Sequence, residues 1–296
     1  MKALVTAPGG GLGNELVNLL LEEGFSLRAL CHPADEAWLE DLGVEVVPGG
    51  LLDEEQVLFA VSGVQAVFNC APRIVLDKKR ARQTTILNLD GTRNLLVSMS
   101  RAGVERLVHV GSAFALASDS GYSALEVASS LRAAQDTVLR YSRDSKVKAS
   151  IVNPALLLGR HDRLGLGALI LRQAEGWRGA APRGRTGIVG ARDAAVCALK
   201  ALGRGKAGAI YTLAAQNVTY AALFELVLAI LESRGSSERG KSARRSRREP
   251  NLDRLLAGDF SYDGEQAALA LGVRWSPLNE VVEEACQVLD KMPDGT

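Results

Sequence analysis

A glycine-rich turn near the start of the chain constrains the fold more than any other feature. Residues 2–13 read Lys-Ala-Leu-Val-Thr-Ala-Pro-Gly-Gly-Gly-Leu-Gly, so a short apolar run leads directly into four glycines within eight residues. From Asn14 to Gly24 the apolar residues recur at helical spacing, which predicts a buried strand, a tight turn and a helix. Unpaired N–H groups at the start of such a helix, beside glycines that admit close approach, suit the pyrophosphate of a dinucleotide.

The spacing of the glycines indicates which residues bind the dinucleotide. Ala7, Gly10 and Gly13 are three residues apart, so the turn reads A-x-x-G-x-x-G. A methyl group at Ala7 would weaken binding if this position needs a positive φ or close cofactor contact. The alternative is a fold of this type whose turn has kept its shape without binding. The contacts expected from the turn are Thr6, Ala7, Gly9, Gly10, Gly11, Leu12 and Gly13.

Strands and helices alternate through the first half of the chain. Apolar runs that read as strands lie at 26–31, 44–47, 66–69 and 106–110. The alternation predicts a parallel sheet covered on both faces, with ligands at the carboxyl ends of its strands. Residues 73–82 are expected to form a charged loop, and Asn88 to open the next helix. Further cofactor contacts are expected from Asn69, Cys70, Ala71 and Asn88.

The residue after the strand at 26–31 bears on the choice of cofactor. An acidic side chain there would bind the 2′-hydroxyl of the adenosine ribose, but the strand runs into His32 and Pro33. His32, with Arg28 nearby, would tolerate a 2′-phosphate better. The sequence therefore favours NADP slightly over NAD. The alternative is that His32 is an ordinary polar residue at a strand end.

Charge and composition exclude several other classes. The formal net charge is +1, so no overall field favours nucleic acid or a membrane surface. No apolar run reaches the roughly 18 residues that span a bilayer, and no signal peptide precedes the first strand. We expect a cytoplasmic protein that spans no membrane. Widely separated cysteines predict buried free thiols and no metal site; they are Cys31, Cys70, Cys197 and Cys286.

The second half of the chain is less regular. Helices are expected at 193–202 and 220–233, with a strand at 210–213 between them. Thr219 is a candidate N-cap, as Asp53 is in the first half. Residues 234–249 are rich in Gly, Ser and basic side chains, which is typical of a mobile, solvated loop.

Seven motifs, in the right order, resemble the extended short-chain dehydrogenase/reductase family, in particular its epimerase/dehydratase and dihydroflavonol-reductase-like branch. They are residues 5–13, 50–53, 88–96, 102–112, 153–159, 193–195 and 263–277. The resemblance implies an α/β fold with a Rossmann-type doubly wound parallel sheet. It implies an NAD(P)-binding domain at 1–150 and a smaller α/β substrate region at 151–296, interleaved with the sheet. It also implies a small-molecule substrate and a homodimer formed near Asn88 and Arg132.

The resemblance further implies a reaction centre of three side chains. A Ser or Thr binds the substrate oxygen, a Tyr moves the proton, and a Lys one helical turn later lowers the pKa of the Tyr and holds the nicotinamide ribose. Ser112 fits the first role. Matching the next helix through residues 132–140 puts Ala128 at the Tyr position and Arg132 at the Lys position. The usual proton donor is then missing, and an arginine does not carry protons.

Tyr122 is the nearest tyrosine that could replace the missing donor. Glu126 follows it by four residues, and a carboxylate there would raise the pKa of the phenol where a lysine would lower it. If catalysis occurs, we expect Ser112 to hold the substrate oxygen, Tyr122 or a water to supply the proton, and Arg132 to anchor the cofactor ribose or phosphate. The alternative is that Tyr122 is a surface or packing residue.

Two functions stay open at this point. One is an NAD(P)-dependent oxidoreductase or epimerase acting on a hydroxyl or carbonyl of a small molecule. The other is a catalytically inactive NAD(P)-binding sensor or scaffold. The loss of the Tyr and Lys favours the second function, whereas the presence of Ser112 and Asn88 favours the first.

Overall fold

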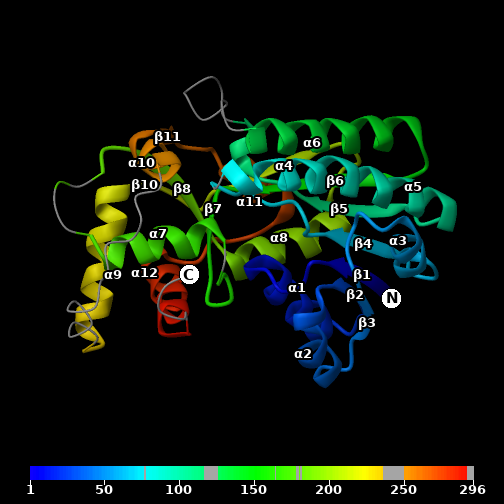
Figure 1. Ribbon diagram of the computed structural model, residues 1–296, viewed down its shortest axis with the longest axis horizontal. Coiled ribbons are helices and arrows are strands. Elements are labelled where there is room, and N and C mark those ends of the chain that lie inside the picture. Colours follow the sequence, from blue (N-terminus) through cyan, green and yellow to red (C-terminus); the bar gives the residue numbers. More distant parts are fainter. Residues whose placement is uncertain are drawn as a thin grey trace.

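A parallel sheet forms the centre of the fold. The computed structural model describes residues 1–76, 78–116, 126–163, 165–177, 180, 182–235 and 250–291. Within these residues one sheet has seven parallel strands in the order β3-β2-β1-β4-β5-β6-β9 (Figure 1). They are β1 (Lys2–Thr6), β2 (Ser26–Cys31), β3 (Glu45–Pro48), β4 (Ala66–Asn69), β5 (Arg106–Val110), β6 (Lys148–Pro154) and β9 (Ile210–Leu213). The predicted Rossmann-type doubly wound sheet is confirmed.

Helices cover both faces of this sheet (Figure 1). Side chains alternate along β1, so Ala3 and Val5 join one apolar cluster and Leu4 joins another, as the pleat of a strand requires. The first cluster includes residues of α1 (Gly11–Glu22), α2 (Glu36–Asp41), α8 (Ala191–Arg204) and α11 (Glu265–Leu271). The second includes residues of α3 (Glu54–Val61), α5 (Thr92–Ala102) and α6 (Glu126–Asp144).

A smaller sheet with its own helices lies beside the first and was not predicted strand by strand. Its order is β10-β8-β11, and β7 also pairs with β8. These strands are β7 (Leu156–Leu158), β8 (Arg185–Gly190), β10 (Gln216–Thr219) and β11 (Asp259–Phe260). Its apolar cluster includes α7 (Leu166–Glu175), α9 (Tyr220–Ser233), α10 (Pro250–Ala257) and α12 (Leu278–Ala285). The boundary expected near residue 150 falls inside β6, and β9 joins the large sheet.

The region around Asn88 differs from its prediction. Residues 73–82 were expected to be a loop, but α4 (Lys78–Ile86) begins inside them because lysine, arginine, alanine and glutamine are good helix formers. A π-helix, Leu87–Gly91, then joins α4 to α5. Asn88 therefore lies within a continuous helical segment and does not open one.

The two predicted helix caps are confirmed. Asp53 Oδ1 accepts a hydrogen bond from Gln56 N at 3.0 Å, at the start of α3. Thr219 Oγ1 accepts one from Ala222 N at 3.1 Å, at the start of α9. Tyr122 and residues 236–249 of the expected basic loop lie outside the described residues. None of the helices described is long and apolar enough to cross a bilayer.

Candidate functional site

The glycine turn joins β1 to α1 and contains one non-glycine residue with a positive φ. Ala7 has a φ of 49°, a left-handed conformation that disfavours a Cβ. Ala7 N donates a hydrogen bond to Leu30 O at 2.9 Å, which fixes the turn against β2. The sequence indicated that a positive φ would be unfavourable for the methyl group of Ala7. The structure has this positive φ at Ala7.

Replacing Ala7 with glycine is expected to stabilise the protein. A glycine adopts this conformation without the clash of its Cβ, so we expect the free energy of unfolding to rise by about 1 kcal/mol. Urea denaturation would measure the change. Ala133→Gly is the matched control, since Ala133 is exposed within α6 and should lose about 1 kcal/mol. A loss of stability in Ala7→Gly would show that the turn does not strain this residue.

The turn is closed at Gly13 and open at Gly10. A Cβ on Gly13 would lie 2.7 Å from Ala7 O and 2.9 Å from Pro8 Cα, so no side chain fits there. A Cβ on Gly10 would meet only Ala7 O, at 3.9 Å. Helix α1 has no side-chain cap at Gly10 and no acidic residue in its first turn. The residues present therefore fit the pyrophosphate of NAD(P), which needs close approach and a helix N-terminus without a side-chain cap.

Asp35 flanks this turn on the side of β2. It ends a 3₁₀ turn, Pro33–Asp35, and a Cβ on Gly9 would overlap its carboxylate. An acidic group therefore does lie beside the glycine turn, although none directly follows β2. His32 is exposed, and its Nδ1 accepts a hydrogen bond from Ala34 N at 3.2 Å.

The sequence suggested that His32, with Arg28 nearby, would tolerate the 2′-phosphate of NADP. In the structure, Arg28 has other partners. Its guanidinium pairs with Glu45 at 2.7 Å. The same group donates hydrogen bonds to the carbonyl oxygens of Phe59, Ala60 and Ser62 at the end of α3. Only 8% of Arg28 is exposed, so this side chain joins β2 to β3 and α3 and does not support His32.

Asp162 reaches the turn from the segment after β7. A Cβ on Gly11 would lie 2.8 Å from Asp162 Cβ, so the two segments pack as closely as a glycine allows. Burial raises the pKa of Asp162 to about 6, although hydrogen bonds from the backbone N–H groups of Ala168, Gly165 and Gly167 lower it. The carboxylate of Asp162 thus holds the start of α7 against the glycine turn.

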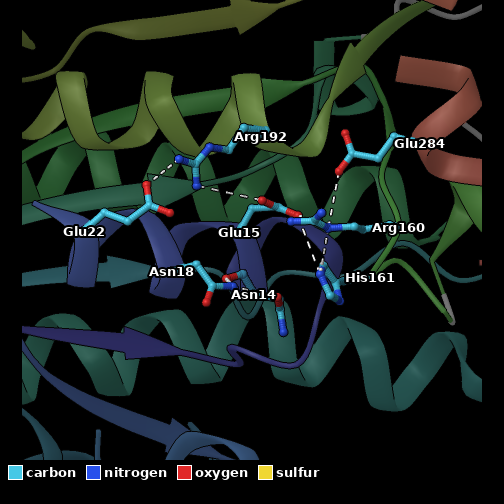
Figure 2. Close-up of polar contacts among 8 residues, drawn as sticks. All are labelled: Asn14, Glu15, Asn18, Glu22, Arg160, His161, Arg192 and Glu284. Carbon is cyan, nitrogen blue, oxygen red and sulfur yellow. Dashed lines mark hydrogen bonds and ion pairs between the residues drawn. The ribbon is translucent and has the colours of Figure 1, made fainter. Parts of the chain in front are cut away.

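Charged side chains fix the same segment to α1 (Figure 2). The carboxylate of Glu15 is 2% exposed and lies 3.3 Å from Arg160 Nε, 3.8 Å from His161 Nε2 and 4.0 Å from Arg192 Nη1. Arg160 Nε is also 3.3 Å from Glu284 Oε1 in α12. The cluster lines a surface pocket of about 700 Å³. Sequence reasoning missed it, because its members come together only in the folded chain.

A buried polar network joins the ends of three neighbouring strands. Thr6 Oγ1 donates to Asn69 Oδ1 at 2.8 Å, and Asn69 Nδ2 lies 3.1 Å from His109 Nδ1. Burial lowers the pKa of His109 to about 4, so the ring is neutral at pH 7 and accepts this hydrogen bond. Cys70 and Ala71 join through their backbone N–H groups, which donate to Thr6 Oγ1 and Asn69 Oδ1. The side chains of Thr6 and Asn69 therefore hold the strand ends together.

Ser112 and Arg132 hold the two ends of one short turn. Ser112 is 5% exposed and follows β5; its Oγ accepts a hydrogen bond from Phe114 N at 3.2 Å. Arg132 Nε donates to Ala115 O at 2.8 Å, within the 3₁₀ turn Ala113–Leu116. Ala128, at the expected Tyr position, is 4% exposed and lies in an apolar cluster with Leu76 and Phe114.

Asn88 makes its hydrogen bonds within the protein. Its Nδ2 donates to Arg73 O at 3.1 Å and to Ser130 Oγ at 3.0 Å, and its Oδ1 accepts from Arg73 N at 3.0 Å. Asn88 thus joins the segment after β4 to α6.

The cysteines are unpaired and poorly suited to chemistry. All four are free thiols, and burial raises the pKa of Cys70 to about 12. Among the side chains described, no group of three His, Cys, Asp or Glu residues could hold a metal ion.

Comparisons with known proteins agree with this fold and with an NAD(P)-binding family. The family model described as NAD(P)H-binding matches residues 9–180, more than half of the chain. Sterol demethylase protein B of Methylococcus capsulatus is 32% identical over 235 residues, 74% of this chain and 71% of that protein. The 3 beta-hydroxysteroid dehydrogenase/Delta 5-->4-isomerase of Mycobacterium tuberculosis (strain H37Rv) is 32% identical over 126 residues, 38% of this chain and 31% of that protein. The crystal structure of gox2253 superimposes with a TM-score of 0.81 and 26% identity, over 98% of this chain and 99% of that one.

The sheet order and the open glycine turn define a dinucleotide-binding protein of the Rossmann type. The chain belongs to the NAD(P)H-binding family, among the extended short-chain dehydrogenase/reductase proteins, as its motifs indicated. Its cofactor class is NAD(P).

Proposed function

We propose that this protein is an NAD(P)-dependent oxidoreductase that interconverts a hydroxyl and a carbonyl on a mainly apolar small molecule. The observation that carries the proposal is the position of two groups at the carboxyl edge of one sheet. The open glycine turn follows β1 and Ser112 follows β5, with only β4 between them. The names of two relatives, a sterol demethylase protein and a steroid dehydrogenase, support an apolar substrate.

In this proposal each residue has a simple task. The nicotinamide supplies or accepts the hydride when the cofactor is bound. Ser112 hydrogen-bonds the substrate oxygen, Tyr122 or a water supplies the proton, and Arg132 anchors the cofactor ribose or phosphate. The hydrogen bond from Arg132 to Ala115 O also supports the turn that Ser112 begins.

Within the NAD(P) class we propose a preference for NAD. The carboxylate of Asp35 lies against Gly9, where it can accept a hydrogen bond from a ribose 2′-hydroxyl and would repel a 2′-phosphate. The slight preference for NADP drawn from the sequence used the absence of an acidic residue directly after β2 and the presence of His32, with Arg28 nearby; the hydrogen bonds of Arg28 go to α3.

Replacing Ser112 with alanine tests the catalytic part of the proposal. Loss of a hydrogen bond to the developing charge on the substrate oxygen should lower kcat/KM about 100-fold, with the Kd for NADH unchanged. Turnover of a panel of ketones and nucleotide sugars, followed by NADH absorbance, measures the first quantity and fluorescence titration the second. Ser150→Ala is the matched control, because Ser150 is also 5% exposed and lies in the interior of β6. Full activity in Ser112→Ala would exclude the assigned role.

A binding protein without turnover is the second candidate. The observation that favours it is Ala128, which puts a buried methyl group, packed near Leu76 and Phe114, where the family carries its Tyr. NADH binding with no turnover of any ketone or nucleotide sugar would select this sensor or scaffold function over the oxidoreductase.

We also propose a cytoplasmic location and a homodimer. Free thiols are typical of reducing compartments, and all four cysteines are free. We propose that the two chains meet near Asn88 and Arg132, as the family resemblance implies. Cell fractionation would test the location, and sedimentation velocity the dimer.

A further inference from the structure

A buried amide lies beside the residue that precedes Ser112. Asn153 is fully buried near the end of β6, and Gly111 directly follows β5. Gly111 N donates a hydrogen bond to Val152 O at 2.9 Å, so the two strand ends are joined at this point. A Cβ on Gly111 would overlap Asn153 Oδ1. The amide oxygen of Asn153 therefore occupies the space that a side chain at position 111 would need.

Only one end of this amide makes a hydrogen bond. Asn153 Nδ2 donates to Gln135 Oε1 at 2.7 Å. Asn153 Oδ1 is buried and accepts no hydrogen bond from the described part of the chain. An unpaired buried oxygen costs stability, and folded proteins satisfy most such groups. The contact with Gly111 gives a reason for this cost, since the oxygen restrains the backbone immediately before Ser112.

Helix α6 holds the segment around Ser112 from both sides. Gln135 is 6% exposed and lies three residues after Arg132, so both side chains are on one face of α6. Arg132 Nε donates to Ala115 O at 2.8 Å, three residues after Ser112. Gln135 acts on the other side of Ser112, through the Asn153 amide. The helix can thus set the position of Ser112 relative to the sheet.

We propose that Asn153 is a positioning residue for Ser112. Gln135 orients the amide of Asn153. The amide oxygen then fixes the backbone at Gly111, and this sets where the Ser112 hydroxyl meets the substrate oxygen. The inference rests on the proposed function, which gives Ser112 its task. A misplacement of about 1 Å in a group of this kind can cost about 100-fold in rate.

Replacing Asn153 with alanine tests this role. The change opens the space beside Gly111, so we expect kcat to fall about tenfold for a ketone or nucleotide sugar that the wild type turns over. KM and the Kd for NADH should change less than about twofold, because the hydrogen bond from Ser112 strengthens only as charge develops on the substrate oxygen. Steady-state kinetics and fluorescence titration measure these quantities. An unchanged kcat would overturn the proposal.

Ser142→Ala is the matched control for a purely structural effect. Ser142 is 5% exposed in α6, and its Oγ accepts a hydrogen bond from Ala149 N at 3.0 Å. It therefore joins the same helix and strand, but at the opposite end of β6. Both Asn153→Ala and Ser142→Ala should lower the thermal midpoint by roughly 3 °C, whereas Ser142→Ala should keep the kcat of the wild type. Equal losses of kcat in the two variants would contradict a specific role for Asn153.

A second pair of variants tests the contact with Gly111 and needs no turnover. Gly111→Ala should lower the thermal midpoint by about 5 °C, because its Cβ overlaps Asn153 Oδ1. In the Asn153→Ala background the same change should cost less than about 1 °C, since Ile151 Cγ2 would then be the nearest atom, at 3.8 Å. The double variant should also have a higher kcat than Gly111→Ala, because the new Cβ fills the vacated space.

These midpoints separate the inference from the proposed function. Equal losses from Gly111→Ala in both backgrounds would show that Asn153 does not fix Gly111, and the inference would fail whether or not the protein is an enzyme. A wild type that turns over no ketone or nucleotide sugar would count against the proposed function, while the midpoints would still decide whether Asn153 fixes the backbone before Ser112.

Discussion

Replacing Gly10 with alanine is expected to weaken NADH binding about 100-fold and to leave the fold intact. A Cβ at this position meets only Ala7 O, at 3.9 Å, so the free protein can accommodate it. The methyl group would instead occupy the space through which the pyrophosphate approaches the backbone. A clash of this kind costs about 3 kcal/mol. Fluorescence titration gives the Kd, and thermal denaturation reports the fold.

Gly203→Ala is the control for this prediction. A Cβ on Gly203 meets nothing within 4 Å, and Gly203 lies near the end of α8, far along the chain from the glycine turn. NADH should bind this variant as it binds the wild type. If Gly10→Ala bound NADH equally well, the cofactor would have to lie elsewhere, and the assignment of the pyrophosphate to the glycine turn would be wrong.

Replacing Asp35 with asparagine is expected to shift the cofactor preference toward NADPH about 30-fold, which corresponds to ~2 kcal/mol. The amide keeps the shape of the side chain beside Gly9 but removes the charge that would repel a 2′-phosphate. It also weakens the hydrogen bond with a 2′-hydroxyl. The quantity to measure is the ratio of the Kd values for NADPH and NADH, at low salt and again at high salt.

The same ratio in Asp41→Asn gives the control. Asp41 is exposed at the end of α2, so this variant has the same net charge without a change at the turn. We expect its ratio to equal that of the wild type. If this ratio stayed unchanged in Asp35→Asn, the proposed role of Asp35 would be wrong. The earlier prediction from His32, a slight preference for NADP, would then be favoured.

The large sheet could be predicted from local sequence because each strand and helix carries its own pattern. The small sheet could not, since β11 has only two residues, Asp259 and Phe260, and no periodicity is measurable over that length. The helix α4 was missed for a different reason. Its basic residues suggested a solvated loop, yet the same residues have high helix propensity.

The cofactor site was predicted where contacts are local and missed where they are tertiary. Gly10 and Gly13 could be found from spacing alone. The approach of Asp35 to Gly9, and of Asp162 to Gly11, depends on how later segments pack against the turn. For Arg28, the nearness to His32 in the sequence misled the prediction. It precedes His32 by four residues, about 13 Å along a strand, and its side chain turns to α3.

Because of the π-helix at Leu87–Gly91, this part of the chain is sensitive to the insertion or deletion of a residue as well as to substitution. A π turn contains one residue more than an α turn, and each residue of an α-helix rotates the next side chain by about 100°. Deleting one residue here would rotate the side chains of α5 about the helix axis by about that angle relative to those of α4. Leu95, Leu96 and Met99, all fully buried, would then leave their cluster. Natural variants of this protein should therefore tolerate substitution at Leu87 far better than insertion or deletion beside it.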